Sequence, residues 1–154
     1  MSDEATDAIC RLKHKYFRLL DTKRFVELGE LFIEDATTDY QSAPSPHNGR
    51  AEIVEFLVNS LSDPGIVHLH NGHHPEIDIH DDGTASGMWY LFDKVIVPSA
   101  DFMLEGTGIY EDNYVLVDDQ WKFKHSGYRR IYEEHRKHST GELISFSSRF
   151  QPAS

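Results

Sequence analysis

The sequence predicts an α+β fold in which helices pack on one face of a strongly curved sheet. Three segments before residue 62 repeat apolar residues every three or four positions, which is typical of helices. After residue 65 the pattern changes to long alternating segments separated by turn signals, which favours antiparallel strands. Neither a repeat nor a dividing linker is visible, so we expect the 154 residues to form one domain.

The helical segments come first in the chain. Residues 3–20 form the first predicted helix, whose Lys and Arg residues should lie mostly on the solvated face. Asp21-Thr22 is a candidate N-cap for a second helix that continues to about Leu31. A third helix should span residues 51–61 and end at Asp63-Pro64-Gly65. The predicted buried stripe of the first helix consists of Ile9, Leu12, Tyr16, Leu19 and Leu20.

The strand segments fill most of the remaining chain. A short strand over 36–40 precedes the third helix, and longer strands are predicted over 66–80, 84–97, 102–116 and 121–132. Asp81-Asp82-Gly83 and Asp118-Asp119 are the turn signals between them. From about residue 138 the chain is polar and Ser-rich, and we expect a flexible or partner-contacting tail with a short strand near 143–146.

Composition narrows the possible partners. Lys and Arg total 15 against 26 Asp and Glu, a formal charge of −11 that disfavours nucleic acid and anionic membranes. No apolar run is long enough to cross a bilayer. A single cysteine, Cys10, and an acidic N-terminus without signal-peptide character make the cytoplasm the expected location.

Histidines are concentrated where the first long strand begins. The stretch His68-Leu69-His70-Asn71-Gly72-His73-His74 holds four of the ten histidines, which suggests proton-transfer chemistry. His-x-His spacing can also bind zinc, but no third ligand is implied. A hydrogen-bonded histidine in a strand wall is the structural alternative.

Two later strands carry charged residues in phase with large apolar ones. Trp89, Leu91 and Asp93 share one strand face, so Asp93 needs a buried partner such as Arg130 or a histidine. Tyr128 shares a face with Arg130. Trp121, Phe123 and His125 are out of phase with that pair, which predicts either two covered faces or a bulge near Gly127.

Six stretches, in order over roughly residues 10–137, together carry a family resemblance. They are Lys15-Tyr16-Phe17-Arg18-Leu19-Leu20-Asp21, Asp39-Tyr40, Gly72-His73-His74-Pro75-Glu76-Ile77, Thr84-Ala85-Ser86-Gly87-Met88-Trp89-Tyr90-Leu91-Phe92-Asp93, Gln120-Trp121 and Ser126-Gly127-Tyr128-Arg129-Arg130-Ile131-Tyr132-Glu133-Glu134-His135. This ordered set resembles the SnoaL-like branch of the nuclear transport factor 2-like superfamily. The resemblance is closest to bile-acid 7α-dehydratase and more distant to scytalone dehydratase. It implies a cone-shaped fold with three N-terminal helices on a mixed, mostly antiparallel sheet.

The resemblance also implies a site. It places Tyr16, Asp21, His70 and Arg130 on catalytic positions. We expect the substrate to contact Tyr40, His73, Trp89, Asp93 and Tyr128. From the residues alone, a core aromatic is the simpler interpretation of Tyr16, and a helix cap is the simpler interpretation of Asp21. For Arg130 the alternative is an exposed strand arginine.

These residues suit elimination of water beside a carbonyl, which needs a base, donors for enolate-like charge and an acid for the leaving hydroxyl. We expect a dehydratase without metal or cofactor, acting on a hydroxylated, hydrophobic ring compound, steroid- or polyketide-like, free or carried as a thioester. His70 would be the base and Asp21 its orienting partner. An isomerase or cyclase, or a binding module without catalysis, are the alternatives. A homo-oligomer, dimer or trimer, is expected because a curved sheet leaves an apolar outer face on which Trp121 and Phe123 could lie.

Overall fold

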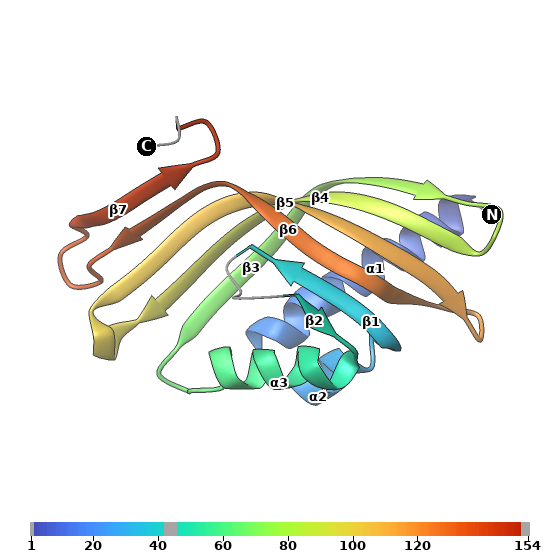
Figure 1. The fold of residues 1–154 in the computed structure, drawn as a ribbon, viewed down its shortest axis with the longest axis horizontal. Helices are drawn as coiled ribbons and strands as arrows, with labels where there is room; N and C mark the ends of the chain where they lie inside the picture. Colours follow the sequence, from blue (N-terminus) through green and yellow to red (C-terminus); the bar gives the residue numbers. More distant parts are fainter. Residues whose placement is uncertain (1, 42–45, 152–154) are drawn as a thin grey trace.

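Three helices lie against the concave side of a curved sheet in the computed structural model, which describes residues 2–41 and 46–151 (Figure 1). The helices are α1 (Ser2–Asp21), α2 (Phe25–Gly29) and α3 (Arg50–Leu61), with a short 3-10 turn, η1 (Pro98–Ala100). The strands are β1 (Phe32–Tyr40), β2 (His47–Asn48), β3 (Val67–Ile79), β4 (Thr84–Val97), β5 (Phe102–Val117), β6 (Gln120–Arg136) and β7 (Leu143–Ser148). None of the described helices has the length and apolar character needed to cross a membrane.

The sheet is mixed and mostly antiparallel, as predicted. Its order is β2-β1-β6-β5-β4-β3, and only the β1–β6 pairing is parallel among these neighbours. The long strand β6 has two partners in turn: its first half pairs with β1 and its second half, Tyr132–Arg136, pairs with β7. The α+β class with three N-terminal helices is therefore confirmed.

The second helix is shorter than predicted. It spans only Phe25–Gly29, and Phe32 already belongs to β1, because Phe32 pairs with Phe123 of β6 and stacks on its ring at 5.0 Å. Asp21 is not the N-cap of this helix, as one interpretation held. It is the last residue of α1, the cap position of α2 is Arg24, and the chain turns between them at Lys23 with a left-handed φ of 59°.

Part of the predicted tail forms a strand. The predicted segment near 143–146 is β7, which continues to Ser148 and projects beyond the helices beside the second half of β6 (Figure 1). Residues 152–154 of the predicted tail lie outside the described residues.

A bulge in β6 resolves the conflict in its apolar pattern. His125 pairs with Asn113 while Phe123 pairs with the next residue, Tyr114, so Lys124 is the extra residue. The bulge was predicted near Gly127 and occurs three positions earlier. It lets Phe123 point into the core, where it is fully buried, so the expectation that Phe123 lies on the outer face is wrong.

The core contains a buried cation, Lys13, which is an exception to the expectation that the basic residues of α1 lie mostly on the solvated face. Its side chain has no exposed area, and its ammonium lies 2.7 Å from Asp112 Oδ2 and 3.5 Å from the centre of the Tyr110 ring. Burial lowers the pKa of Lys13, and the charge of Asp112 opposes that effect. We call the set that surrounds Asp112 the Lys13 network: Lys13, Asp112, Ser126 (2.7 Å to Oδ1), Tyr114 (2.9 Å to Oδ2) and Trp89, whose Nε1 donates to Tyr114.

Candidate active site

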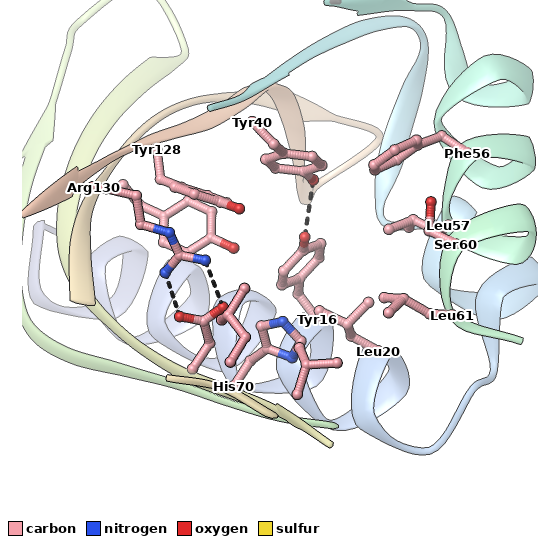
Figure 2. A pocket seen from close by; sticks show the side chains of 14 residues that line it. Tyr16, Leu20, Tyr40, Phe56, Leu57, Ser60, Leu61, His70, Tyr128 and Arg130 are labelled. Atoms are coloured by element: carbon pink, nitrogen blue, oxygen red, sulfur yellow. Dashed lines mark hydrogen bonds and ion pairs between the residues drawn. The ribbon is translucent and has the colours of Figure 1, made fainter. Parts of the chain in front are cut away.

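A cavity of about 350 Å³ lies between α3 and the concave face of the sheet (Figure 2). Figure 2 shows Arg130 on the side away from α3, and the hydroxyls of Tyr40 and Tyr16 pointing toward each other between Arg130 and α3. The walls of the cavity are mainly apolar and aromatic, and a few polar groups converge on its interior, as in pockets for small molecules. The lining residues are Tyr16, Leu20, Tyr40, Phe56, Leu57, Ser60, Leu61, His70, Asp93, Val95, Leu104, Tyr110, Tyr128 and Arg130.

The cavity brings together most of the residues singled out in the sequence. Three of the four predicted catalytic residues line it, namely Tyr16, His70 and Arg130. Asp21 does not line the cavity but lies behind His70, within hydrogen-bond distance. The predicted substrate-binding residues Tyr40, Asp93 and Tyr128 line it as well.

Two predicted substrate-binding residues do not line this cavity. Trp89 is buried in the core, where it belongs to the Lys13 network. His73 is exposed because strand alternation places it opposite His68 and His70, and the inward position next to it is Gly72. A Cβ at Gly72 would lie 2.5 Å from the ring of Phe17, so α1 packs too closely there for a histidine.

His70 is held by Asp21 through two contacts. His70 Nδ1 lies 2.8 Å from Asp21 Oδ1, and the backbone N–H of His70 donates to Asp21 Oδ2 at 2.9 Å. An ionised carboxylate only accepts hydrogen bonds, so Nδ1 of His70 carries the proton. Its Nε2 is then left with a free lone pair, on a ring that lines the cavity. This is the arrangement of an oriented general base.

The acidity of Asp21 follows from the same contacts. Burial acts to raise its pKa, but the hydrogen bonds from His68 and His70 outweigh burial and lower the pKa from 3.8 to about 2. Since the folded-state pKa is depressed, the associated stabilisation is present above pH 3.8 and is lost as the pH falls through about 2.

Asp21→Asn should therefore reduce the acid sensitivity of the fold. In the wild-type protein we expect about 2 kcal/mol of the unfolding free energy to disappear between pH 5 and pH 2 on account of this carboxyl. The measurement is urea unfolding at a series of pH values, with Asp81→Asn in the exposed β3–β4 turn as the control. Identical pH dependence in the wild type and in Asp21→Asn would contradict the assignment.

Two tyrosines form a second polar element of the cavity. The hydroxyl of Tyr16 lies 2.9 Å from that of Tyr40, and either can be the donor (Figure 2). Burial raises the pKa of both phenols well above the usual value, so both remain protonated donors at neutral pH. Tyr110 is a further side-chain hydrogen-bond partner of Tyr16.

The third polar element is an ion pair between Arg130 and Asp93. Both Asp93 oxygens accept from the guanidinium, and Nη2 to Oδ2 is 2.9 Å (Figure 2). Burial works to lower the pKa of Arg130, but Asp93 outweighs it and raises the pKa above its usual value. Strand register aligns His70 of β3, Asp93 of β4 and Gly106 of β5 in one row.

Gly106 makes room for this ion pair. A Cβ at Gly106 would lie 2.9 Å from Arg130 Nη1, so a larger residue would displace the guanidinium. Arg130 Nε lies 2.8 Å from Glu133 Oε2 without the alignment of a hydrogen bond. Nη1 and Nη2 of Arg130 both donate to Asp93, and each of these two nitrogens has a second N–H that can donate to another partner.

Some lining residues were not identified from the sequence. α3 contributes Phe56, Leu57, Ser60 and Leu61, none of which was assigned to the site from the sequence. Tyr110 was also missed, although Gly106, Gly108 and Tyr110 share the inward face of β5 and could have indicated it. The wall from α3 gave no signal because its role depends on tertiary packing.

Among the described residues, one group has donor atoms close enough for a metal ion. It consists of Asp21, His68 and His70, whose ligand atoms lie within 4.8 Å of one another. Both imidazoles direct Nδ1 at the same carboxylate oxygen, at 2.8 and 3.2 Å. Hydrogen bonds between these residues account for this geometry.

Comparisons with known proteins agree with the fold described above. The sequence profile of the SnoaL-like domain matches residues 2–127. The chain is similar to a candidate scytalone dehydratase from Novosphingobium aromaticivorans, with a TM-score of 0.77 and 23% identity over 100% of both chains. It is also similar to hexachlorocyclohexane dehydrochlorinase LinA-type3 from Novosphingobium barchaimii, with a TM-score of 0.72 and 14% identity over 94% of this chain and 90% of the other. ActVI-ORFA from Streptomyces coelicolor matches with a TM-score of 0.71 and 15% identity over 82% of this chain and 97% of that chain.

Proposed function

Because the chain belongs to the SnoaL-like domain family, we propose that it is a cofactor-independent dehydratase. The observation that carries this proposal is the His70–Asp21 pair, with His70 Nδ1 at 2.8 Å from the carboxylate and the ring on a mainly apolar cavity. The substrate would be a hydroxylated, hydrophobic ring compound with a carbonyl that acidifies the neighbouring C–H. A cavity of about 350 Å³ with aromatic walls suits a molecule of this kind.

The reaction requires removal of a proton from carbon and delivery of a proton to the leaving hydroxide. His70 Nε2 takes the proton from the carbon beside the carbonyl, and Asp21 stabilises the imidazolium that forms. The electron pair of that C–H bond becomes an enolate and then forms the new double bond as the C–O bond breaks. The departing hydroxide takes the proton that His70 has acquired and leaves as water, which returns the site to its starting state. Tyr16 and Arg130 supply the donors for the enolate oxygen or for the leaving hydroxyl.

Two observations support an elimination over other acid–base reactions. A dehydratase and a dehydrochlorinase, as these relatives are named, both belong to the reaction class in which H and a neighbouring substituent leave together. The polar groups of this cavity also lie on separate walls, with His70 on β3, Tyr16 on α1 and Arg130 on β6. Such an arrangement can contact the C–H, the carbonyl and the leaving group at the same time.

The test is a panel of cyclic and fused-ring β-hydroxyketones. Turnover should produce a conjugated enone, detected by its ultraviolet absorbance, and a product lighter by one water in mass spectrometry. A product of unchanged mass would instead indicate an isomerase or cyclase. Saturable binding without turnover across the panel would favour a binding module and overturn the proposal.

Tyr16→Phe should lower kcat by about 10²-fold, because one preorganised donor is removed from the site. KM should change much less, since the ring itself still packs in the core. Tyr40→Phe is the matched variant that removes the other hydroxyl of the pair. Equal small effects of both substitutions on kcat would contradict a role for the tyrosine pair in the transition state.

A further inference from the structure

His68 is a buried imidazole next to the candidate site that the proposed mechanism does not use. Its side chain has no exposed area, and it is not part of the cavity wall. It lies two residues before His70 on β3, so both rings point to the same side of the sheet. Their ring centres are 5.4 Å apart.

His68 and His70 share one carboxylate oxygen. Asp21 Oδ1 lies 3.2 Å from Nδ1 of His68 and 2.8 Å from Nδ1 of His70. Because the carboxylate can only accept, both rings carry a proton on Nδ1. A second donor on the same oxygen draws negative charge away from the bond to His70. Asp21 therefore stabilises a protonated His70 less than it would if His70 were its only partner.

Lys23 contacts the other ring nitrogen of His68. Its ammonium lies 3.4 Å from His68 Nε2 and also donates to the backbone carbonyl of Leu61 at the end of α3. An ammonium has no acceptor, so His68 Nε2 must offer its lone pair. A proton on Nε2 would place two cations side by side. The left-handed turn at Lys23, with φ 59°, brings the ammonium to this position.

We propose that His68, held neutral by Lys23, is a positioning residue that shares Asp21 with His70 and limits how basic His70 becomes. The charged and titratable groups around His68 are Asp21 from α1, Lys23 from the following turn and His70 on its own strand. Burial lowers the pKa of Lys23, and the charge of Asp63 opposes that effect. The β4 residue opposite His68 is the apolar Val95.

This inference deepens the proposed function, because it matters for catalysis only if His70 is the base. A base must be unprotonated before it can accept a proton, and a full ion pair with Asp21 would favour the protonated form. By sharing the carboxylate, His68 would keep a larger fraction of His70 ready to react near neutral pH.

The test is an NMR titration of the His70 ring without any substrate. The His70 signal is assigned by its absence in His70→Asn. His68→Leu should raise the titration midpoint of His70 by about 0.5 to 1 pH unit, because Asp21 then serves His70 alone. His68→Asn is the matched control, because its amide nitrogen stands the same number of bonds from Cα as Nδ1 and can still donate to Asp21. Its midpoint should stay within about 0.2 unit of wild type.

Lys23→Met is an independent test, in which the expected shift of the His70 titration midpoint has the opposite sign. Without the ammonium, His68 can take a proton on Nε2, bind Asp21 more strongly and lower the midpoint of His70. An unchanged His70 midpoint in His68→Leu, or equal shifts in His68→Leu and His68→Asn, would overturn the proposal. If His68→Leu does not fold, Lys23→Met decides: a lower midpoint supports the proposal, and an unchanged or higher one refutes it. Failure to find turnover would refute the dehydratase and leave this titration valid.

Discussion

His70→Asn should lower kcat/KM by about 10²- to 10⁴-fold on any substrate that the protein turns over, which is the range of a general base. The asparagine amide can still donate to Asp21 from the place of Nδ1, so the bond that holds the carboxylate is kept. What is lost is Nε2, the nitrogen that would take the substrate proton. We therefore expect the melting temperature to stay within about 4 °C of wild type, the shift that roughly 1 kcal/mol produces at this size.

The control for this experiment is His73→Asn. His73 lies on the exposed side of the same strand, three residues further on, so its loss should leave both kcat/KM and stability close to wild type. A His70→Asn protein that is folded and still active would exclude His70 as the base. One that is unfolded would show that His70 serves the structure, which is the alternative considered from the sequence.

Lys13→Met should lower the free energy of unfolding by about 3 to 5 kcal/mol, because it leaves the buried carboxylate of Asp112 without its cation. Ser126 and Tyr114 still donate to Asp112, so its hydrogen bonds are only partly lost. The measurement is urea unfolding at neutral pH. Asp112→Asn combined with Lys13→Met should be less destabilising than the sum of the two single changes, since neither charge is then buried alone.

Lys15→Met is the control for the buried lysine. Lys15 is exposed on the same helix, and its replacement should change the unfolding free energy by no more than about 0.5 kcal/mol. Equal effects of the two methionine substitutions would show that the Lys13–Asp112 pair does not contribute as its burial suggests.

The sequence predicted the fold class and most element boundaries because the patterns for α1, α3 and β3 to β6 are long. Errors appeared where a local signal competed with a distant contact. Asp21 has the chemistry of a helix cap, but its oxygens accept from His68 and His70 on β3. Phe32 continues a helical pattern, but its pairing with β6 makes it the start of a strand.

Burial of charge was the least predictable property. Lys13 occurs among other basic residues of α1, and its sequence neighbours do not reveal the carboxylate it meets, which is 99 positions away. The pairing of Arg130 with Asp93 could be proposed because both residues were in phase with large apolar ones. His68 was left without a role, since its hydrogen bond depends on the turn at Lys23.

The strand β6, which pairs first with β1 and then with β7, also affects how the site can form during folding. Its contacts join residues far apart in the chain: Arg130 meets Asp93 across 37 positions and Arg129 meets Asp39 across 90. Loops of this length cost entropy to close before their contacts form, so folding of such a topology is slow compared with a helical bundle. A nascent chain that ends before β6 can bring His70 to Asp21, across 49 positions, but it lacks the wall that carries Arg130. Ligand binding to the complete cavity is therefore a late event in synthesis, and it would report that the last long strand has joined the sheet.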